Sequence, residues 1–415
     1  MKYSIVTFGC RVNQADSLGF EEELLACGAT AASPEQADLV VVNTCSVTAS
    51  ADQSARQTIR RIARSNPDAR IVVTGCYATR QPADVASLPN VVRVIPNRAK
   101  AALVADALTT AERFGDGDGN CGARIEPGVA GRTAFTLRVQ TGCAEECSYC
   151  IIPSTRGLPA SVPLGDVQRQ VERITDAGFK EIALTGVHLG SYGRDLVPRS
   201  SLLELLTALA ALKRDVLFRI SSLEPMDCSR RIVDLVASSP SFAPHFHLPL
   251  QHASSRVLSA MGRPYTIAYY SDLVEHVRHR LPAASIGSDV IVGFPGETDS
   301  DFEELAAYLE TSPLTHLHVF PYSDRPGTRA AAMGGAVAGP IVRQRAAAIR
   351  AISQRLAARF NQSQIGTIRP GLTLEDGTLV VTDNYMKLRV AAGRHRNEWV
   401  RVRVVSDHDG ELLAG

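Results

Sequence analysis

Residues 135–150 read FTLRVQTGCAEECSYC, a short apolar strand pattern followed at once by a loop with three cysteines. Thiolates spaced as C-x3-C-x2-C, here Cys143, Cys147 and Cys150, are typical of metal ligands rather than of packing residues. A structural zinc site closes with four ligands, and the sequence offers no fourth Cys or His nearby. Three thiolates around a four-iron cluster instead leave one iron open to a small molecule. The loop therefore predicts an iron–sulfur centre at the end of a strand.

Strand and helix patterns alternate downstream of this loop. Such alternation predicts βα units with a parallel sheet, and about six units predict a partial TIM-type barrel with its site at the strand carboxyl ends. The expected strands are Phe135–Val139, Glu181–Thr185, Val216–Ser221, His245–Leu250, Ser285–Val292 and His316–Phe320. The expected helices are Asp166–Ala177, Ser201–Leu212, Ser229–Ser238, Ile267–Leu281 and Asp299–Thr311.

Upstream of the loop, three short β-branched runs each end in a cysteine. They read YSIVTFGC at 3–10, DLVVVNTC at 38–45 and RIVVTGC at 70–76, with helical patterns over Ala15–Cys27 and Ala51–Ala63 between them. Parallel strands joined by helices have their carboxyl ends on one edge of the sheet, where ligands bind. We therefore expect a Rossmann-like parallel α/β domain in which Cys10, Cys45 and Cys76 converge as metal ligands. The alternative is three buried cysteines at strand ends.

The rest of the chain indicates two boundaries. Glycine-rich residues 113–132 indicate a flexible connector. Residues 365–413 show strand-like runs with turn signals, which predict a small β-barrel. We therefore expect an α/β protein with domains 1–112, 133–360 and 361–415.

The C-terminal third is basic, although the whole chain has a net charge of only +1. The segment 337–370 holds six arginines and no acid, and Ile341–Phe360 has a helical pattern. Such a run forms either an electrostatic surface for a polyanion or the solvated face of a helix. The charge pattern alone leaves both interpretations open.

Composition limits the other possibilities. No apolar run approaches the ~18 residues that a membrane helix needs, and the N-terminus lacks a signal-peptide pattern. We therefore expect a cytoplasmic protein with reduced thiols and no membrane partner. Of the nine cysteines, Cys27, Cys121 and Cys228 match no motif and are expected to pack as small hydrophobic residues.

The cysteine loop, with Tyr149 in its aromatic position, resembles the cluster loop of the radical S-adenosylmethionine enzymes. The resemblance implies a catalytic [4Fe-4S] cluster on the three cysteines, with S-adenosyl-L-methionine on the open iron. An electron from such a cluster splits the cofactor and yields a radical that water must not reach.

More of the chain resembles one branch of these enzymes, the methylthiotransferases. The matching segments are Thr7–Gln14, Asn43–Cys45, Thr74–Cys76, Cys150–Pro153, Arg156-Gly157, Leu184–Val187, Ser191–Gly193, Arg219–Pro225, His247–Gln251, Asp289–Thr298 and Phe320–Ser323. The C-terminal barrel, with Asn384-Tyr385, resembles the family's RNA-binding TRAM module. The chain departs from the family at Ala160-Ser161-Val162, where Arg-Ser-Arg is common, and Arg11 stands where Lys is common.

The resemblance implies a second [4Fe-4S] cluster on Cys10, Cys45 and Cys76 that carries the sulfur. One S-adenosylmethionine would methylate this sulfur, and a second would supply the radical that activates a C–H bond. A methylthio group then replaces the hydrogen. An electron donor of the flavodoxin or ferredoxin type and a sulfur donor are implied as partners.

The expected substrate rests on Gly9–Gln14, GCRVNQ, which most resembles the branch that acts on N6-threonylcarbamoyladenosine beside the tRNA anticodon. We therefore expect the tRNA anticodon stem-loop as partner and C2 of this nucleoside as the reacting carbon. The isopentenyl branch tends to Gly-Cys-Gln-Met-Asn and the ribosomal branch to Gly-Cys-Pro-Lys-Asn. The alternatives are a sister enzyme acting on isopentenyladenosine or on a ribosomal-protein aspartate, and a non-enzymatic iron–sulfur RNA-binding protein.

Several residues after the barrel strands are expected around the cofactor. They are Tyr149, Gly186, Ser222, Glu224, Gln251 and Asp289. Gly186 would let the backbone approach the cofactor closely. A structural hydrogen-bonding role is the alternative for each residue. We expect His188, His245 and His247 to be core histidines rather than ligands.

Overall fold

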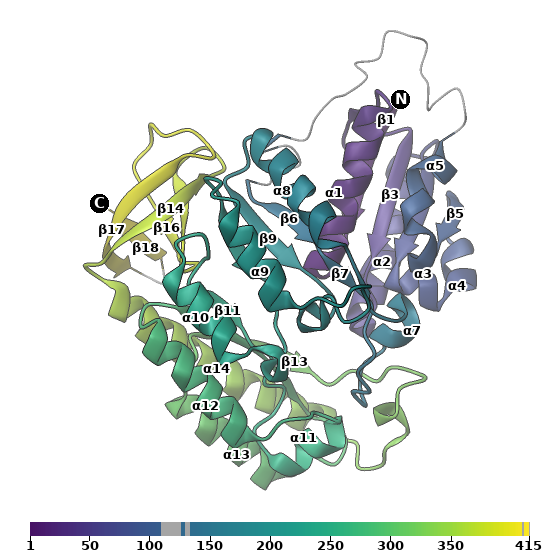
Figure 1. Ribbon diagram of the computed structural model, residues 1–415. Coiled ribbons are helices and arrows are strands. Elements are labelled where there is room, and N and C mark those ends of the chain that lie inside the picture. Colours follow the sequence, from purple (N-terminus) through teal and green to yellow (C-terminus); the bar gives the residue numbers. More distant parts are fainter. Residues whose placement is uncertain (109–125, 129–132, 409–410, 415) are drawn as a thin grey trace.

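The computed structural model describes residues 1–108, 126–128, 133–408 and 411–414. Figure 1 shows an α/β domain at the N-terminal end and a small β-barrel at the C-terminal end, on either side of a central barrel. This architecture confirms the predicted fold class. The expected connector, 113–132, lies outside the described residues except for 126–128, so the domain boundaries remain predictions.

The N-terminal domain is built on a five-stranded sheet in the order β2-β1-β3-β4-β5, in which every neighbouring pair is parallel. Its strands are β1 (Lys2–Thr7), β2 (Thr30–Ala31), β3 (Leu39–Thr44), β4 (Arg70–Gly75) and β5 (Val91–Ile95). Its helices are α1 (Arg11–Ala26), α2 (Ala49–Ser65), α3 (Cys76–Arg80), α4 (Pro82–Ala86), η1 (Asn97–Ala102) and α5 (Leu103–Ala107). This is the strand order of flavodoxin-like folds, which bind ligands at the carboxyl edge of the sheet.

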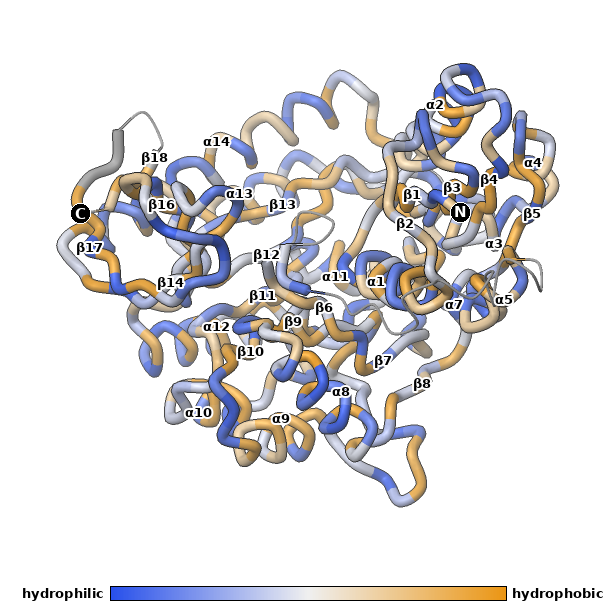
Figure 2. The backbone as a smooth tube through the Cα atoms, turned by 90° about the horizontal axis from the view of Figure 1, so that it is seen from above, coloured by the Kyte–Doolittle hydropathy of each residue, from blue (hydrophilic) through white to orange (hydrophobic). Residues whose placement is uncertain are grey.

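Helices cover both faces of this sheet because its central strands are apolar on both sides. Val40 and Val42 of β3 pack with α2, whereas Leu39 and Val41 of the same strand pack with α1. In Figure 2 the hydrophobic colour follows β3 and β4, while α2 alternates between hydrophilic and hydrophobic. Buried parallel strands between two helix layers account for the continuous apolar run in this part of the sequence.

The boundaries of the first strand and helix differ from the expectation. The strand ends at Thr7 instead of Cys10, and the helix begins at Arg11 instead of Ala15. Gly9, between them, has a φ of 89°, a conformation that glycine adopts without the steric cost of a Cβ. Strand β5 and helices α3 to α5 were not predicted, because their apolar runs are too short to show a period.

The central barrel has six strands in two parallel sheets, β10-β9-β6 and β11-β12-β13. The strands are β6 (Phe135–Arg138), β9 (Glu181–Thr185), β10 (Leu217–Ile220), β11 (His245–His247), β12 (Ser285–Val292) and β13 (His316–Pro321). A hydrogen bond of 2.9 Å from Leu223 N to His247 O helps to join β10 to β11. The predicted six-stranded partial barrel is confirmed, with a break in the ladder between its two halves.

Helices cover the outside of the barrel. They are α8 (Leu164–Asp176), α9 (Leu202–Ala211), α10 (Arg230–Ser238), α11 (Ser255–Met261), α12 (Ile267–Arg280), α13 (Asp299–Thr311) and α14 (Gly339–Gln364). Short elements at the carboxyl end of the strands are β7 (Gln140–Thr141), α7 (Ile152–Arg156), β8 (Ala160–Ser161) and η3 (Leu189–Ser191). Ser201 and Thr298 form capping boxes before α9 and α13, which fix where these strand-to-helix loops end.

The C-terminal barrel closes in the order β14-β15-β16-β18-β17. Its strands are β14 (Ile368–Leu374), β15 (Leu379–Thr382), β16 (Lys387–Arg389), β17 (Trp399–His408) and β18 (Glu411–Ala414). Phe360 at the end of α14 packs into its core, so the two barrels share a helix. In the described part of the chain, no helix combines the length and the apolar character that crossing a bilayer requires.

Candidate functional site

Three cysteines lie at the carboxyl edge of the N-terminal sheet. In the sheet register Thr7 on β1 pairs with Asn43 on β3, and Asn43 pairs with Thr74 on β4. The three strands therefore end level with one another. The cysteines that follow within three positions are Cys10, Cys45 and Cys76. We call them the sheet-edge trio.

Two glycines allow the loops of this trio to approach closely. A Cβ built on Gly9 would lie 2.5 Å from Sγ of Cys45, and one built on Gly75 would lie 2.1 Å from the carbonyl oxygen of Thr44. Both glycines have a positive φ, so another residue would have to displace a neighbouring loop. Gly9 and Gly75, which directly precede Cys10 and Cys76, thus have a steric role in bringing these loops together.

The environment of the sheet-edge trio is uneven. Cys10 is exposed, whereas Cys45 and Cys76 are buried. Burial, with smaller contributions from the charges of Cys10 and Cys76, raises the pKa of the Cys45 thiol to about 11. Asn97 directs its Nδ2 at Cys76 Sγ at 3.6 Å. A thiolate at Cys45 therefore requires a positive partner, as a metal site supplies.

The other trio, Cys143, Cys147 and Cys150, lies in one loop between β7 and α7 and is called the loop trio. Backbone N–H groups point at two of its sulfurs, with Glu145 N at 3.4 Å from Cys143 Sγ and Ile152 N at 3.5 Å from Cys150 Sγ. Burial raises the pKa of the Cys150 thiol to about 12, and it also raises that of Cys147. The thiols of Cys147 and Cys150 therefore need a positive partner to become thiolates, as a metal site supplies.

Helix α11 supports the loop trio from outside the loop. Ser148 donates its backbone N–H to Met261 O at 2.9 Å and its hydroxyl to Ala260 O at 2.8 Å. Tyr149 packs against the apolar group that contains Met261 and Phe294, and burial raises its pKa well above the usual value. The aromatic position expected near the cofactor is thus also a packing position.

A buried arginine contacts the middle cysteine of the loop. Arg263 Nη1 donates to Cys147 Sγ at 3.3 Å, while Nη2 pairs with the carboxylate of Glu224. The arginine side chain is only 2% exposed. Glu224 was expected near the cofactor, and the structure connects it to the cysteine loop through Arg263. Arg263 itself was not predicted from the sequence.

A buried histidine contacts the first cysteine of the loop. His188 Nδ1 lies 3.7 Å from Cys143 Sγ, and its Nε2 lies 2.6 Å from Asp227 Oδ2. Burial alone would lower the pKa of His188, but the hydrogen bonds to Asp227 and Cys143 raise it to about 10. The expectation of a core histidine is correct for its burial, but the sequence did not indicate its contact with a cysteine.

A cavity of about 190 Å³ is lined by Cys150 of the loop trio and by Val47 and Thr48, which follow Cys45 of the sheet-edge trio. Its walls include Thr48 beyond Cys45, Tyr149 and Cys150 of the cysteine loop, and Gln251, Asp289 and Phe320 of the barrel. The expected cofactor residues Tyr149, Gln251 and Asp289 therefore meet at one place. A larger cavity, of about 600 Å³, lies at the amino end of the barrel strands and is lined by none of the cysteines.

The remaining expected cofactor residues have different surroundings. Gly186 follows β9, and a Cβ there would lie 2.9 Å from Oε1 of Gln140, the residue that precedes the cysteine loop by three positions. The same Cβ would lie 3.2 Å from Cα of Leu189, so a larger residue at position 186 would crowd the base of the cysteine loop. Ser222 is exposed and does not line the cavity that Cys150 and Thr48 line.

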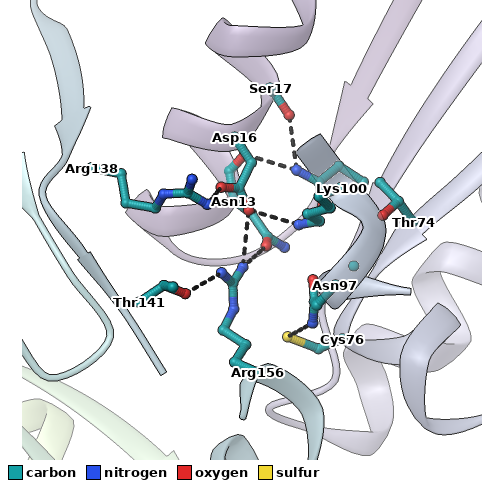
Figure 3. A network of polar contacts seen from close by, with 12 residues as sticks. Asn13, Asp16, Ser17, Thr74, Cys76, Asn97, Lys100, Arg138, Thr141 and Arg156 are labelled. Atoms are coloured by element: carbon teal, nitrogen blue, oxygen red, sulfur yellow. Dashed lines mark hydrogen bonds and ion pairs between the residues drawn. The ribbon is translucent and has the colours of Figure 1, made fainter. Parts of the chain in front are cut away.

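A network of ion pairs around the buried Asp16 joins the N-terminal domain to the central barrel (Figure 3). Asp16 of α1 pairs with Lys100 Nζ at 2.7 Å, with Arg156 Nη2 at 3.2 Å and with Arg138. Burial would raise the pKa of Asp16, but the three cations lower it below its usual range. Arg156 also donates to Asn13, and its charge interacts with Cys76. The Arg-Gly motif therefore connects the end of the loop trio to the sheet-edge trio.

A second polar cluster lies inside the barrel. His247 Nε2 and His318 Nδ1 lie 2.9 and 3.1 Å from the same oxygen of Asp289, and the two rings stack. Burial would raise the pKa of Asp289, but the two histidines hold it well below its usual range. His247 is buried, as expected of a core histidine, and its partner Asp289 lies on the cavity wall.

Three of the six arginines in the basic segment 337–370, Arg345, Arg355 and Arg369, pair with acids in the described part of the chain. Arg345 is buried against Glu297 and Asp299, and Arg355 pairs with Glu310. These acids come from elsewhere in the chain, which the local charge count did not reveal. Arg345 and Arg355 of helix α14 are therefore held by contacts within the protein, which lowers the number of its arginines that are available to a polyanion.

Both trios fit a four-iron cluster better than a single ion. Sulfurs bound to one zinc would lie ~4 Å apart, given its Zn–S bonds. Among the described residues, only His247, Asp289 and His318 bring three candidate ligand atoms within 4.8 Å of one another. The two cysteine trios are thus more widely spaced than a mononuclear site requires. Their donor chemistry, three thiols each, is that of iron–sulfur ligands.

Protein families with matching sequences cover both trios. Residues 2–96 match the family described as uncharacterized protein family UPF0004, and residues 137–309 match the radical SAM superfamily. The solved structure of the radical S-adenosylmethionine methyltransferase TsrM from Kitasatospora setae, with cobalamin and a [4Fe-4S] cluster, has a TM-score of 0.55 at 15% identity. That likeness covers 80% of this chain and 77% of the other, and it shows the fold alone.

Curated relatives extend over the whole chain. "Threonylcarbamoyladenosine tRNA methylthiotransferase MtaB" of Aquifex aeolicus is 35% identical over 97% of this chain and 100% of its own length. The protein of the same name from Bacillus subtilis is 36% identical over 98% of both chains. "tRNA-2-methylthio-N(6)-dimethylallyladenosine synthase" of Corynebacterium efficiens is 32% identical over 100% of this chain and 82% of its own.

The partial barrel and its three-cysteine loop, with the superfamily match, define an enzyme of the radical SAM class. Identity above 30% across the full length of named relatives narrows this class. The chain belongs to the methylthiotransferase family.

Proposed function

We propose that the protein is a tRNA methylthiotransferase that replaces the C2 hydrogen of N6-threonylcarbamoyladenosine beside the anticodon with a methylthio group. The observation that carries the proposal is one cavity lined both by Cys150 of the loop trio and by Val47 and Thr48, which follow Cys45 of the sheet-edge trio. Full-length relatives named for this reaction support the choice of nucleoside. The proposed ligands of two [4Fe-4S] clusters are Cys10, Cys45, Cys76, Cys143, Cys147 and Cys150.

The residues of this chain hold and shield the reacting groups. When bound, the clusters and S-adenosylmethionine would supply the electron, the sulfur and the methyl group. Arg263 and His188 place positive groups against two of the loop thiolates, which offsets their charge in a dry site. Tyr149 and its apolar neighbours exclude water from the side of the loop that faces the barrel.

The cavity offers the chemistry that binds a flipped-out base. Phe320 on its wall is 37% exposed, and an aromatic face of this kind stacks on an adenine. Gln251 and Asp289 supply polar groups for the edge of the base. On the C-terminal barrel, Arg401 and Arg403 are exposed on β17 and would contact phosphates of the stem-loop.

The cysteine thiols of the protein indicate the compartment in which the reaction takes place. Free cysteines and low-potential clusters need a reducing compartment, so we place the reaction in the cytoplasm. The proposed partners are an electron donor of the flavodoxin or ferredoxin type and a sulfur donor.

Nucleoside analysis of tRNA by mass spectrometry tests the proposal. A strain that lacks the gene should lose the methylthio group from threonylcarbamoyladenosine and retain it on isopentenyladenosine. The wild-type gene should restore the mark, and a Cys45→Ala gene should not. Loss of the isopentenyl mark instead would assign the chain to the sister reaction, for which the Corynebacterium relative is named. Unchanged tRNA, together with no cleavage of S-adenosylmethionine by the reconstituted protein, would remove the enzymatic proposal.

A further inference from the structure

His188 stands against the loop trio with a nitrogen aimed at a sulfur. It follows β9 directly before η3, and its side chain is 3% exposed. Nδ1 lies 3.7 Å from Cys143 Sγ, within range for a hydrogen bond to sulfur. The other group near this nitrogen is Glu145, whose Oε1 at 3.8 Å is too far for a hydrogen bond. Cys143 is therefore the acceptor that Nδ1 faces.

The ring is held in this orientation from its other side. Its Nε2 lies 2.6 Å from Asp227 Oδ2, and Asp227 is itself paired with Arg194. The backbone N–H of His188 donates to Gln140 Oε1 at 2.9 Å. Two independent contacts thus fix both the backbone and the ring, so the approach to the sulfur is not a chance rotamer.

Both ring nitrogens face acceptors. Asp227 offers a carboxylate oxygen, and Cys143 offers a thiolate once it binds iron. An iron-bound thiolate accepts hydrogen bonds and has no proton to donate, so the contact between Nδ1 and Cys143 is favourable when Nδ1 is the donor. This arrangement resembles the outer-shell partners of metal ligands, which orient the ligand and tune the metal.

We propose that His188 donates an N–H···S hydrogen bond to Cys143 in the cluster-bound enzyme and thereby raises the reduction potential of the cluster, with Asp227 as the residue that orients the ring. The inference rests on the proposed placement of that cluster on the loop trio. Reduction adds negative charge to the cluster and its thiolates, and a donor at sulfur stabilises the more negative state. His188 is a positioning residue, because it acts through Cys143.

The test is a redox titration followed by electron paramagnetic resonance. Full-length protein carrying Cys10→Ala, Cys45→Ala and Cys76→Ala leaves one cluster to titrate. In this background His188→Leu should shift the midpoint to a more negative potential. His188→Asn keeps an N–H near the position of Nδ1 and should restore most of the shift. His279→Leu, an exposed histidine on α12, is the matched control and should not change the potential.

The outcomes separate this inference from the proposed function. Absence of iron in the protein with His188 intact would overturn the cluster site itself. A loaded His188→Leu protein with an unchanged midpoint would overturn the role of His188 alone. If the Leu variant fails to retain iron, Asp227→Asn decides, because it keeps His188 but removes its orienting carboxylate. A midpoint lower than that of the parent protein supports the inference, and an equal one overturns it.

Discussion

The two cysteine trios, proposed as ligands of two clusters, are assembled in different ways. The loop trio lies within eight residues of sequence, and its geometry comes from a short loop supported by α11. The sheet-edge trio spans Cys10 to Cys76, and its geometry comes from the register of three parallel strands. One site is therefore a local property of the chain, and the other is a property of a folded domain.

This difference shows where each site is vulnerable. The loop trio depends on neighbours from distant segments, His188 in the loop after β9 and Arg263 in the loop after α11. The sheet-edge trio depends on steric fit, because Gly9 and Gly75 leave no room for a Cβ. Substitutions around the loop trio should therefore alter the reactivity of its site. Substitutions around the sheet-edge trio should instead prevent its three cysteines from coming together.

The largest expected effect comes from the cysteines themselves. Cys143→Ala should abolish cleavage of S-adenosylmethionine and product formation, and Cys45→Ala should abolish the methylthio product but retain cleavage to 5′-deoxyadenosine. The physical reason is that each substitution removes one of the three ligands proposed for a different cluster. Anaerobic turnover assays with quantified iron check both. Loss of both activities in Cys45→Ala would contradict a division of labour between the trios.

The next effect concerns the network between the two domains. Arg156→Met should lower the free energy of unfolding by about 3 kcal/mol, because it removes a buried cation from Asp16 and Asn13. The matched control is Arg138→Met, whose side chain is 39% exposed and which should cost less than about 1 kcal/mol. Urea titrations measure both, and equal losses would show that Arg156 is not a special contact.

Acid should destabilise the barrel more than the N-terminal domain. All ten histidines lie at or beyond His188. Burial lowers the pKa of His252 to about 4, and its Nδ1 accepts a hydrogen bond from Ser254 N. A folded pKa below the unfolded value of about 6.5 means that the unfolded chain binds the proton first. The contribution of the neutral His252 to the free energy of unfolding is therefore fully present above pH 6.5, and it is lost as the pH is lowered toward 4.

The expected loss from His252 alone is about 2 kcal/mol at pH 5. Hydrogen exchange measured by mass spectrometry at pH values corrected for intrinsic rates should show the loss in peptides of β11 and β12. Peptides of β3 and β4 should change less. A His252→Gln variant should reduce the pH dependence of the barrel, and an unchanged dependence would assign the effect to other groups.

The smallest expected effect is at the exposed side of the domain contact. Arg173 on α8 pairs with Glu22 on α1, and the two side chains are 56% and 25% exposed. Arg173→Ala should change stability by less than about 1 kcal/mol, because solvent screens such pairs. Thermal melting checks this, with Arg156→Met as the sensitive comparison. A loss as large as that of Arg156 would show that exposure does not distinguish the two contacts.

The sequence by itself determined the alternation of strands and helices and the spacing of the loop trio. Both are local: a β-branched run of five or six residues and C-x3-C-x2-C have meaning without the rest of the chain. The convergence of Cys10, Cys45 and Cys76 was also predictable, because parallel βα units leave little choice about which edge their strand ends share. The segments that resemble those of the methylthiotransferases also predicted the type of reaction.

Only the tertiary structure decided which charges meet. Asp16, Lys100 and Arg156 are separated by more than fifty residues at each step, and so are Cys143 and the acid that orients its histidine, Asp227. No local pattern marks such pairs, because they depend on how separate elements pack. The arginines of α14 show the same limit, since their acidic partners come from α13 and the loop before it. Periodicity and spacing are read along one segment, whereas electrostatic partners are a property of distance in space.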